Sequence, residues 1–352
     1  MGKEPFKMSV IICTYNRADL LKGALETLND QYMPRGDYQI IVVDDGSTDK
    51  TEHMTKLMAK GMYERLEYYR IEHAGRAAAR NKGLKEAQGD WILFVDDDIL
   101  APPDLLQEHF DYHKTRPHIV VRGPIINIKQ YQIPDKHSAS WRDYSSAFFC
   151  TCNASVSKFA LLQVGGFDES FMEYGFEDNE LGWRLREKGW NAQFNSKAIV
   201  YHYKPEQPKE HMTHMIKQAQ ELGRSAVAYY RKHPHWKVAL ATGLHPALKP
   251  WNKLLSSEFI GNLWMKSWDG RVDTMGSGMR SFLESRIFQY HYLKTLEEEF
   301  ARTQAAVEEP AGPVNKHLEG ARPPKGEPGT VGNKNLRANV HLQQKAPPWE
   351  SS

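Results

Sequence analysis

Three consecutive aspartates, Asp96, Asp97 and Asp98, directly follow the apolar residues 91–95 (WILFV). An apolar run of this length between charged residues is typical of a strand buried in a parallel sheet. Open α/β sheets bind ligands at the carboxyl ends of such strands, which is where the triplet would lie. Adjacent carboxylates repel one another unless a cation neutralises them, and hard oxygen ligands favour Mg²⁺ or Mn²⁺ over Zn²⁺. If the triplet stood alone, a solvated acidic turn would be the simpler explanation.

Further polar residues follow two earlier apolar runs and begin an Ala-rich segment. Residues 8–13 lead into the polar stretch 14–17, and residues 39–43 lead into the acidic stretch 44–49. The residues of interest in these stretches are Thr14, Asn16, Arg17, Asp45, Arg76 and Arg80. A metal and arginines suit the diphosphate of a sugar nucleotide, and a carboxylate suits its base or ribose.

The elements that would position these groups alternate between strand and helix. Residues 18–31 carry leucine and alanine at the spacing of a helix face, and residues 66–70 form a weaker third strand. This alternation predicts right-handed crossovers and one mostly parallel sheet. The polar loops would then gather along one edge of that sheet and share a cleft.

Four segments resemble, in order and spacing, the landmarks of the family 2 glycosyltransferases. They are residues 14–17 (TYNR), 43–49 (VDDGSTD), 76–83 (RAAARNKG) and 96–98 (DDD). The resemblance implies the GT-A fold, an α/β fold with a Rossmann-like, mostly parallel sheet flanked by helices.

The same resemblance implies roles for single residues at a nucleotide-sugar site. Asp45 would contact the base, commonly uracil. Asp96 and Asp98 would form the D-x-D signature, with Asp98 on the metal and Asp96 facing the ribose or the metal's water shell. The other residues assigned to the donor are Thr14, Asn16, Arg17, Arg76, Arg80 and Asp97, with Thr14 and Arg80 as nucleotide and phosphate contacts.

The acidic pair Glu177 and Asp178 begins a predicted helix in the second half of the chain. Leu181 and Leu185 lie on one face of that helix, and Gly189 would end it. Carboxylates at a helix start can accept hydrogen bonds from its free amides, so capping is one interpretation. The segment also resembles the Gly-Gly-Phe-Asp-Glu and Glu-Asp elements of inverting GT-A enzymes. That resemblance implies that Asp178 is the general base and that Glu177 holds the acceptor.

His202 follows the strand-like residues 198–200. A single histidine at a strand end is more often structural than a ligand. Some GT-A enzymes complete the metal site with a histidine after the Glu-Asp helix, so the resemblance makes His202 a candidate ligand beside Asp96 and Asp98. Imidazole with carboxylates is compatible with Mn²⁺, and the implied cofactor is Mn²⁺ or Mg²⁺.

The chain divides into three predicted regions. Residues 1–204 would form the GT-A catalytic domain, in which we expect residues 127–146 to be a loop of the kind that often recognises an acceptor. Residues 205–303 are mostly helical in pattern and rich in aromatic side chains. We expect them to pack on the catalytic domain; an acceptor platform, a homodimer interface or a peripheral membrane contact are the alternatives. Residues 304–352 are rich in proline, glycine and charge and are expected to be disordered.

Composition narrows the class of protein. The 352 residues carry a net charge of +2, which gives no general case for a nucleic-acid partner. The three cysteines cannot all pair, which fits reduced thiols in the cytoplasm. The sequence suggests neither a signal peptide nor an apolar run of membrane-spanning length. We therefore expect a cytoplasmic protein, or one that is peripheral on the inner face of the membrane.

The sequence thus predicts a metal-dependent, inverting glycosyltransferase that moves a sugar from a nucleotide sugar, with a UDP-sugar favoured, to a glycan or other acceptor hydroxyl. Two alternatives stay open. A sugar-nucleotide nucleotidyltransferase requires a glycine-rich phosphate loop after its first strand, and residues 13–17 contain no glycine. A non-catalytic glycan-binding or scaffold protein would not require all the carboxylates at positions 96, 98, 177 and 178. Polysaccharide biosynthesis is an expectation from the family alone.

Overall fold

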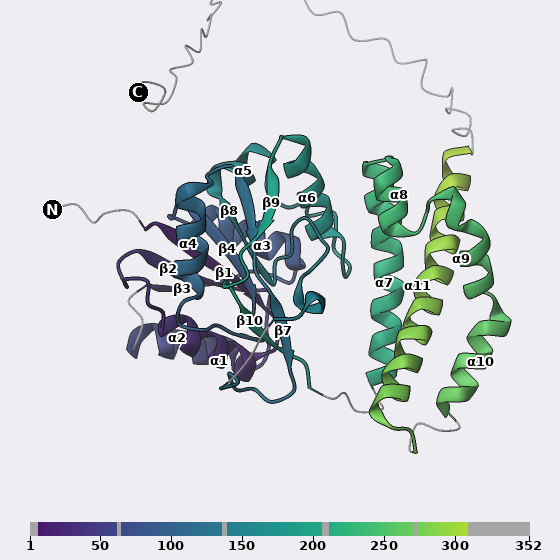
Figure 1. Cartoon of the computed structure of the whole chain (residues 1–352), viewed down its shortest axis with the longest axis horizontal. Helices are drawn as coiled ribbons and strands as arrows, with labels where there is room; N and C mark the ends of the chain where they lie inside the picture. The colour runs from purple at the N-terminus through teal and green to yellow at the C-terminus, as the bar shows by residue number, and fades with distance from the viewer. Residues whose placement is uncertain (1–5, 62–64, 136–138, 206–210, 270–273, 309–352) are drawn as a thin grey trace, which may run out of the picture. The chain divides into compact units, whose positions relative to one another are not determined.

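The computed structural model describes residues 6–61, 65–135, 139–205, 211–269 and 274–308 (Figure 1). The first part of the chain forms a seven-stranded sheet with the order β3-β2-β1-β4-β8-β6-β9. These strands are β1 (Met8–Thr14), β2 (Tyr38–Asp44), β3 (Leu66–Arg70), β4 (Trp91–Asp96), β6 (Ile119–Arg122), β8 (Asn153–Ser157) and β9 (Asn191–Phe194). Neighbouring strands are parallel except that β8 runs antiparallel to both β4 and β6. The expected mostly parallel sheet is confirmed.

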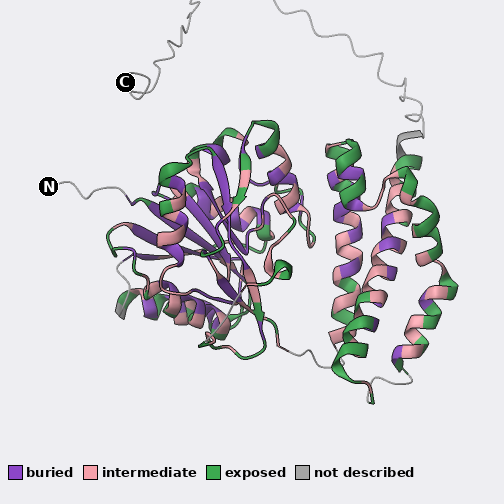
Figure 2. Ribbon diagram, in the orientation of Figure 1, coloured by how far each residue is buried: buried purple, intermediate pink, exposed green. Residues whose placement is uncertain are grey.

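Helices cover both faces of this sheet. One face carries α1 (Ala18–Asn29), α2 (Thr51–Gly61) and α4 (Leu105–Thr115), and the other carries α3 (Arg76–Glu86), α5 (Lys158–Gln163) and α6 (Glu177–Glu187). Successive strand side chains point to opposite faces, so Val10 and Ile12 pack in one core and Ile11 packs in the other. Figure 2 shows the strands mostly buried and the helices buried on one side only. Strands covered on both faces explain the continuous apolar runs in the sequence.

A second, three-stranded sheet has the order β5-β10-β7. Its strands are β5 (Ile99–Leu100), β7 (Ile125–Ile128) and β10 (Val200–Tyr203). We expected His202 to follow the end of a strand. This expectation is wrong, because His202 lies inside β10. The predicted loop at 127–146 also needs correction, because β7 includes its first two residues and Trp141–Asp143 form a short 3₁₀ helix. Residues 136–138 of that predicted loop lie outside the described residues.

The chain continues as helices, which confirms the expected helical C-terminal region. They are α7 (His211–Lys232), α8 (Trp236–Thr242), the 3₁₀ helix η2 (Pro246–Leu248), α9 (Lys249–Leu255), α10 (Glu258–Asp269) and α11 (Ser277–Glu308). Helices α7 and α11 pack through a small core of Ala226, Val227, Leu293 and Leu296. Helix α11 continues to Glu308, past the predicted tail boundary at 304, and the rest of that predicted tail lies outside the described residues. By their contacts, residues up to Ala306 belong to one compact unit.

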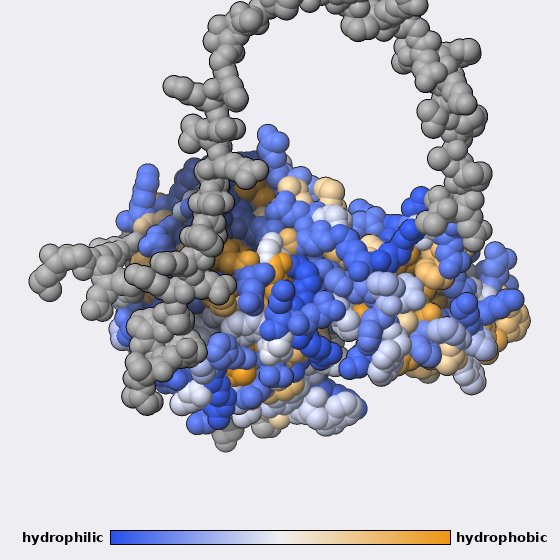
Figure 3. Space-filling model, turned by 90° about the horizontal axis from the view of Figure 1, so that it is seen from above, coloured by the Kyte–Doolittle hydropathy of each residue, from blue (hydrophilic) through white to orange (hydrophobic). Residues whose placement is uncertain are grey.

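The surface is mostly hydrophilic on the face that Figure 3 shows, with small hydrophobic patches between charged side chains. Exposed apolar side chains on α9 and α10 include Trp251, Leu254, Phe259 and Leu263. Among the helices that the structure describes, none is long and apolar enough to span a bilayer.

Candidate functional site

A candidate metal site forms where β4 ends and the small sheet begins. Asp96, Asp98 and His202 each offer one ligand atom, and the three atoms lie within 4.8 Å of one another. The strand register explains this arrangement, because His202 lies opposite Ile99, the residue after Asp98. Nδ1 of the His202 ring lies 2.9 Å from Asn127 Oδ1 on β7, and Nε2 lies 3.3 Å from Asp98 Oδ1. The three predicted ligands, separated widely in sequence, are thus brought together.

This donor set fits a hard divalent cation. Oδ1 of Asp98 is buried and forms no well-aligned hydrogen bond among the described residues; its contact with His202 Nε2 is long, at 3.3 Å. A buried carboxylate oxygen with so weak a partner is costly, and a bound ion would satisfy it. Two carboxylates and one imidazole suit Mn²⁺ or Mg²⁺. Asn127, which sequence analysis placed in a loop, orients the imidazole ring as outer groups of metal sites commonly do.

Asp97 has different partners from its two neighbours. Its carboxylate is buried, accepts a hydrogen bond from the Thr14 hydroxyl at 2.7 Å and pairs with Arg17 at 3.1 Å. Arg17 also pairs with Asp98 Oδ2 at 2.8 Å. Burial raises the pKa of Asp97 to about 6, although Arg17 opposes that rise. Thr14, Arg17 and Asp97 therefore join the loop after β1 to the acidic triplet.

Asn16 joins the loops that follow β1 and β2. Its backbone is left-handed, with φ of 54°. Its amide oxygen accepts a hydrogen bond from the Thr48 backbone at 2.7 Å, and its own backbone N–H donates to Ser47 Oγ at 2.8 Å. The predicted donor contact Asn16 thus has its side-chain oxygen bonded within the protein.

Asp45 lies just after β2, with its carboxylate fixed by backbone amides. The oxygens accept hydrogen bonds from Ala74 at 2.8 Å and Gly75 at 3.1 Å, and Oδ2 lies 2.9 Å from His73 Nδ1. The Tyr15 ring, 45% exposed, stacks on His73 with centroids 4.7 Å apart. An exposed ring beside a fixed carboxylate can stack on a base while the carboxylate accepts its hydrogen bond. Sequence analysis gave no role to Tyr15 or His73. Tyr15 could have been found as an aromatic residue within the polar stretch 14–17.

The buried guanidinium of Arg80 joins α3 to the start of α6. Nη1 lies 2.7 Å from Glu177 Oε1 and 3.2 Å from Asp178 Oδ1, while Nη2 donates to Thr151 Oγ1 at 2.6 Å. Thr151 in turn donates to Asp178 Oδ2 from its backbone N–H and its hydroxyl, both at 2.9 Å. Among the described residues, the donors to Asp178 therefore come from other segments and not from the amides of α6. Arg80, predicted as a phosphate contact, is placed against this acidic pair.

The two carboxylates differ in their proton affinity. Burial raises the pKa of Asp178 to about 6, because Arg80 compensates only in part and Glu177 adds a nearby negative charge. Burial would also raise the pKa of Glu177, but the ion pair and hydrogen bond with Arg80 lower it overall. Separated pKa values allow one carboxylate to exchange a proton while the other stays charged. Oε2 of Glu177 is buried and accepts no hydrogen bond among the described residues, so a ligand hydroxyl could donate to it.

Tyr174 and Arg76 contact each other, and the charges of the candidate metal site and of the acidic pair both affect the pKa of Tyr174. The exposed Arg76 places its guanidinium 4.8 Å from the centroid of the Tyr174 ring. Burial raises the pKa of Tyr174, Arg76 lowers it, and the charges of Glu177, Asp96 and Asp178 raise it further. Tyr174 is therefore within electrostatic range of both groups. Sequence analysis gave Tyr174 no role, and its position three residues before Glu177 was the available signal.

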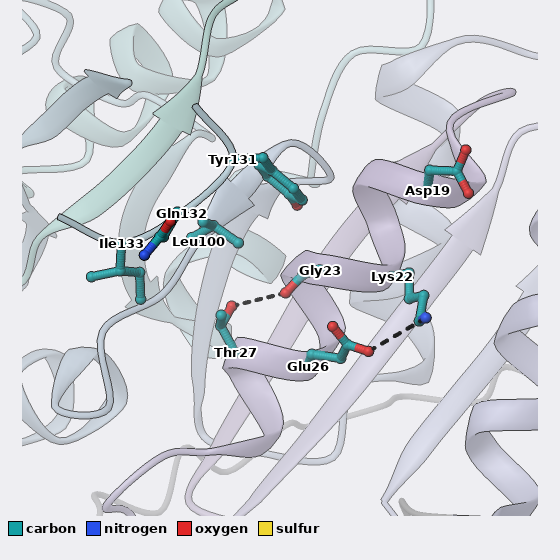
Figure 4. A pocket seen from close by; sticks show the side chains of 9 residues that line it. All are labelled: Asp19, Lys22, Gly23, Glu26, Thr27, Leu100, Tyr131, Gln132 and Ile133. Carbon is teal, nitrogen blue, oxygen red and sulfur yellow. Dashed lines mark hydrogen bonds and ion pairs between the residues drawn. The ribbon is translucent and has the colours of Figure 1, made fainter. Parts of the chain in front are cut away.

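A separate pocket of about 350 Å³ lies between α1 and the segment that follows β7 (Figure 4). It is lined by Asp19, Lys22, Gly23, Glu26 and Thr27 of α1, by Leu100 of β5, and by Tyr131, Gln132 and Ile133. The Tyr131 ring approaches α1 closely, because a Cβ at Gly23 would lie 2.4 Å from it. The pocket is lined by none of the predicted site residues.

Two family models match the chain. The model described as glycosyl transferase family 2 matches residues 9–166, and the model described as N-terminal domain of galactosyltransferase matches residues 136–208. The first range contains Asp45 and the acidic triplet, and the second contains the Glu177–Asp178 pair and His202.

Curated relatives are similar over part of their length. The chain is 28% identical over 255 residues to the uncharacterized glycosyltransferase YfnE of Bacillus subtilis (strain 168), covering 56% of this chain and 64% of that protein. It is 31% identical over 220 residues to validoxylamine A glucosyltransferase of Streptomyces hygroscopicus subsp. jinggangensis, covering 52% of each. It is 27% identical over 241 residues to chondroitin synthase of Escherichia coli, covering 56% of this chain and 35% of that protein. The chain spans about half the length of the curated relatives it matches.

Two solved structures share the fold. A mannosyltransferase from Pyrobaculum calidifontis, in complex with GDP-Man and Mn²⁺, superposes with a TM-score of 0.55 at 18% identity, covering 85% of this chain and 88% of that chain. GalNAc-T7 with UDP, GalNAc and Mn²⁺ gives a TM-score of 0.51 at 13% identity, covering 63% of this chain and 48% of that chain. At these identities the likeness shows the fold. The chain thus has the GT-A fold, matches the model described as glycosyl transferase family 2 over residues 9–166 and is similar to proteins named glycosyltransferases.

Proposed function

We propose that the protein transfers a sugar from a nucleotide sugar, with a UDP-sugar favoured, to an acceptor hydroxyl with inversion at the anomeric carbon. The observation that carries this proposal is the placement of Asp178. Its carboxylate is held by Arg80 and Thr151 and is within electrostatic range of the same tyrosine as Asp96. Direct displacement at the anomeric carbon requires a general base and a cation. The proposed base and the candidate metal site at one edge of the sheet would supply them.

In the proposed reaction, Asp178 takes the proton of the acceptor hydroxyl as the acceptor oxygen attacks the anomeric carbon. The bond from that carbon to the phosphate oxygen breaks, and the nucleoside diphosphate leaves with the electron pair. Oδ1 of Asp178 is the proposed proton acceptor, since its single hydrogen bond among the described residues is the longer one, 3.2 Å to Arg80. Glu177 would hold the acceptor through its unbonded Oε2.

The remaining residues would bind the metal and the nucleotide-sugar donor. Asp98, Asp96 and His202 would hold Mn²⁺ or Mg²⁺, and the cation would stabilise the negative charge of the departing diphosphate. Asp45 and Tyr15 would bind the nucleoside, and the exposed Arg76 would reach the phosphates. GDP-Man and UDP are bound by the two structural neighbours, so both bases belong in the test.

A calorimetric screen of UDP- and GDP-sugars, with and without Mn²⁺, tests the donor before any acceptor is known. We expect Mn²⁺-dependent binding of a UDP-sugar. Incubation of that donor with candidate glycans should then give UDP and a glycoside of inverted configuration. Pyrophosphate exchange would favour a nucleotidyltransferase, and binding without turnover would favour a glycan-binding protein.

The cellular setting is also a proposal. We place the protein in the cytoplasm or on the inner face of the membrane, in the assembly of a polysaccharide or another glycan. Contact with a membrane surface or with a second copy would involve residues 205–303. Sedimentation with phospholipid vesicles and a mass measurement in solution distinguish these two partners.

A further inference from the structure

The segment between Phe167 and Glu180 contains the acidic pair and is held from two sides. On the side of α3, Asn81 exchanges two hydrogen bonds with the Phe167 backbone, both at 2.8 Å. On the side of α7, Arg224 pairs with Glu173 at 2.8 Å. Further along α7 and just after it, Lys232 pairs with Asp168 and His233 contacts Glu180 at 3.0 Å. The helical region thus forms one of the two supports of the segment that carries Glu177 and Asp178.

Phe176, directly before the acidic pair, has an unfavourable backbone. Its φ of 64° and ψ of −8° lie in the left-handed region, and the preceding Gly175 has φ of 93°. For a bulky residue such as phenylalanine this conformation is an outlier that costs free energy, and it persists only where surrounding contacts enforce it. Strained residues of this kind cluster at functional sites.

The contacts that enforce this conformation come from the C-terminal helices. The Phe176 ring stacks on Tyr229 of α7, with centroids 5.7 Å apart and an interplanar angle of 26°. The same ring packs against the core that joins α7 to α11, which includes Val227 and Leu293. Helix α7 also comes close to the backbone here, because a Cβ at Gly175 would lie 2.3 Å from Leu222 Cδ1. Phe176 therefore anchors the start of α6 in the helical region.

We propose that Phe176, held against Tyr229, is the positioning residue that sets Asp178 and Glu177 against Arg80, so that the helical region is a working part of the active site. The inference rests on the proposed function of Asp178 as the base. A change of φ or ψ at Phe176 rotates the first turn of α6 and moves both carboxylates together. It would break the bonds of Asp178 to Thr151 at 2.9 Å and to Arg80 at 3.2 Å.

The test compares Phe176→Ala, Tyr229→Ala and Tyr229→Phe in the full chain. We expect the two alanine variants to lower kcat by about 10²-fold, the size of effect that small displacements of a reacting group produce. Donor KM and Mn²⁺-dependent nucleotide affinity should stay near wild type, because the metal group and Asp45 are untouched. Tyr229→Phe keeps the stacked ring and should retain activity. Trp264→Ala is the matched control, since it removes an aromatic contact with Phe282 inside the helical region and spares the acidic segment.

The pH profile of kcat is a second measurement. A general loss of stability would not change the pH at which kcat falls. The charged and titratable groups around Asp178 are Arg80 on α3, Glu177 on α6, Cys150 before β8 and Tyr174. Displacement of the first turn changes both the burial and the contacts with Arg80 and Thr151 that set the pKa of Asp178, so the acid limb of the profile should shift in Phe176→Ala. An unmoved limb together with a normal kcat would overturn the proposal.

Phe176→Gly separates the ring from the backbone. Glycine adopts positive φ at no steric cost, so this variant permits the conformation but removes the anchor. We expect it to lose as much activity as Phe176→Ala, and full activity in Phe176→Gly would contradict the anchor. Tyr229→Leu, which fills volume without a flat ring, replaces any alanine variant that fails to fold. Asp178→Asn, measured in parallel, distinguishes the role of Asp178 as the base from the role of Phe176 as the positioning residue. If Asp178→Asn keeps its activity, the proposed base is wrong. If Asp178→Asn loses activity while the Phe176 and Tyr229 variants keep theirs, only the positioning role is wrong.

Discussion

As the proposed general base, the carboxylate of Asp178 would have to be charged to accept a proton and basic enough to attract one. Its surroundings serve both requirements, because burial raises its pKa to about 6 while Arg80 and Thr151 stabilise the charged form. Glu177 shares Arg80 and stays ionised at lower pH. The contacts of these two adjacent acids thus shift their pKa values in opposite directions.

Asp178→Asn should lower the rate of transfer by roughly 10²–10⁴-fold, the usual contribution of a general base. The amide keeps the shape and still accepts from Thr151, so the melting temperature and donor affinity should change little. Turnover, calorimetry with the nucleotide sugar and a thermal melt of the same variant check this. Glu177→Gln is the companion variant, and it should weaken acceptor binding more than it slows the chemistry.

The pH dependence of kcat tests the same residue. The base works only when deprotonated, so kcat should fall as pH decreases through about 6 and level off above it. The residual activity of Asp178→Asn should lack this acid limb. A limb that persists in Asp178→Asn would assign it to another group.

Asp45→Ala should weaken the binding of uridine and of UDP by similar factors, because the proposed contact is to the nucleoside. Calorimetry with both ligands measures this, and Tyr15→Ala should behave alike if its exposed ring stacks on the base. An effect confined to UDP would place Asp45 at the phosphates instead. Tyr32→Ala, which removes another exposed tyrosine, 76% exposed, is the control.

At the scale of elements, the small sheet assembles the metal group. β10 pairs with β5 and with β7, so one register places His202 beside Asp98 and beside Asn127. A shift of one residue would turn His202 to the opposite face of the sheet and remove it from the site. Binding of a cation would therefore depend on the pairing of β10 with β5 and β7 as well as on the identity of the ligand residues.

Asn127→Ala should lower Mn²⁺ affinity by about 10–100-fold, the usual effect of losing a group that orients a histidine ligand. Asp98→Ala should abolish Mn²⁺-dependent binding of the nucleoside diphosphate while leaving the fold cooperative. Titration of Mn²⁺ by calorimetry measures both. Asn262→Ala on the exposed side of α10 serves as the control, and unchanged Mn²⁺ affinity in Asn127→Ala would remove the orienting role.

At the scale of the whole molecule, a buried polar network joins α4 to the sheet behind the site. His109 contacts Ser155 Oγ at 2.7 Å and Asn153 Oδ1 at 2.9 Å, and His113 contacts the same Ser155 at 2.8 Å. Asn153 also donates to the carbonyl groups of Pro124 and Ala198, which hold the strands that lead into the small sheet. Burial lowers the pKa of His109 to about 4 and that of His113 to about 3.

Acid should therefore destabilise the fold through this network. Between about pH 6.5 and about pH 4 the unfolded chain binds protons at both histidines and the folded chain does not, so the free energy of unfolding falls as pH decreases. Each histidine contributes up to about 1.4 kcal/mol per pH unit in that window. Denaturant unfolding at several pH values measures this slope. His113→Phe cannot protonate and should flatten it, whereas the exposed His53→Gln should leave it unchanged.

Strands β1 to β4 and the polar residues that end them could be predicted from the sequence. The acidic triplet after β4 and Asp45 after β2 could be predicted because a strand end is a local feature, read from a few neighbouring residues. The mostly parallel sheet could be predicted because the alternation of strands and helices leaves few allowed connections, whereas the GT-A fold came from the resemblance to known enzymes. The ligand set of Asp96, Asp98 and His202 required the resemblance to known enzymes as well.

Which of these residues lie together depends on the tertiary structure. Arg80 is separated by 98 positions from Asp178, and no local pattern predicted that it would pair with the acidic segment. His202 required the register of β10, and Asn127 required that β7 extend into a predicted loop. Phe176 resembled any core aromatic in the sequence, and its left-handed backbone and its contact with Tyr229 of α7 are visible only in the structure. The physical reason is common to all four: local spacing determines how an element forms, whereas contacts between distant segments depend on how the elements pack.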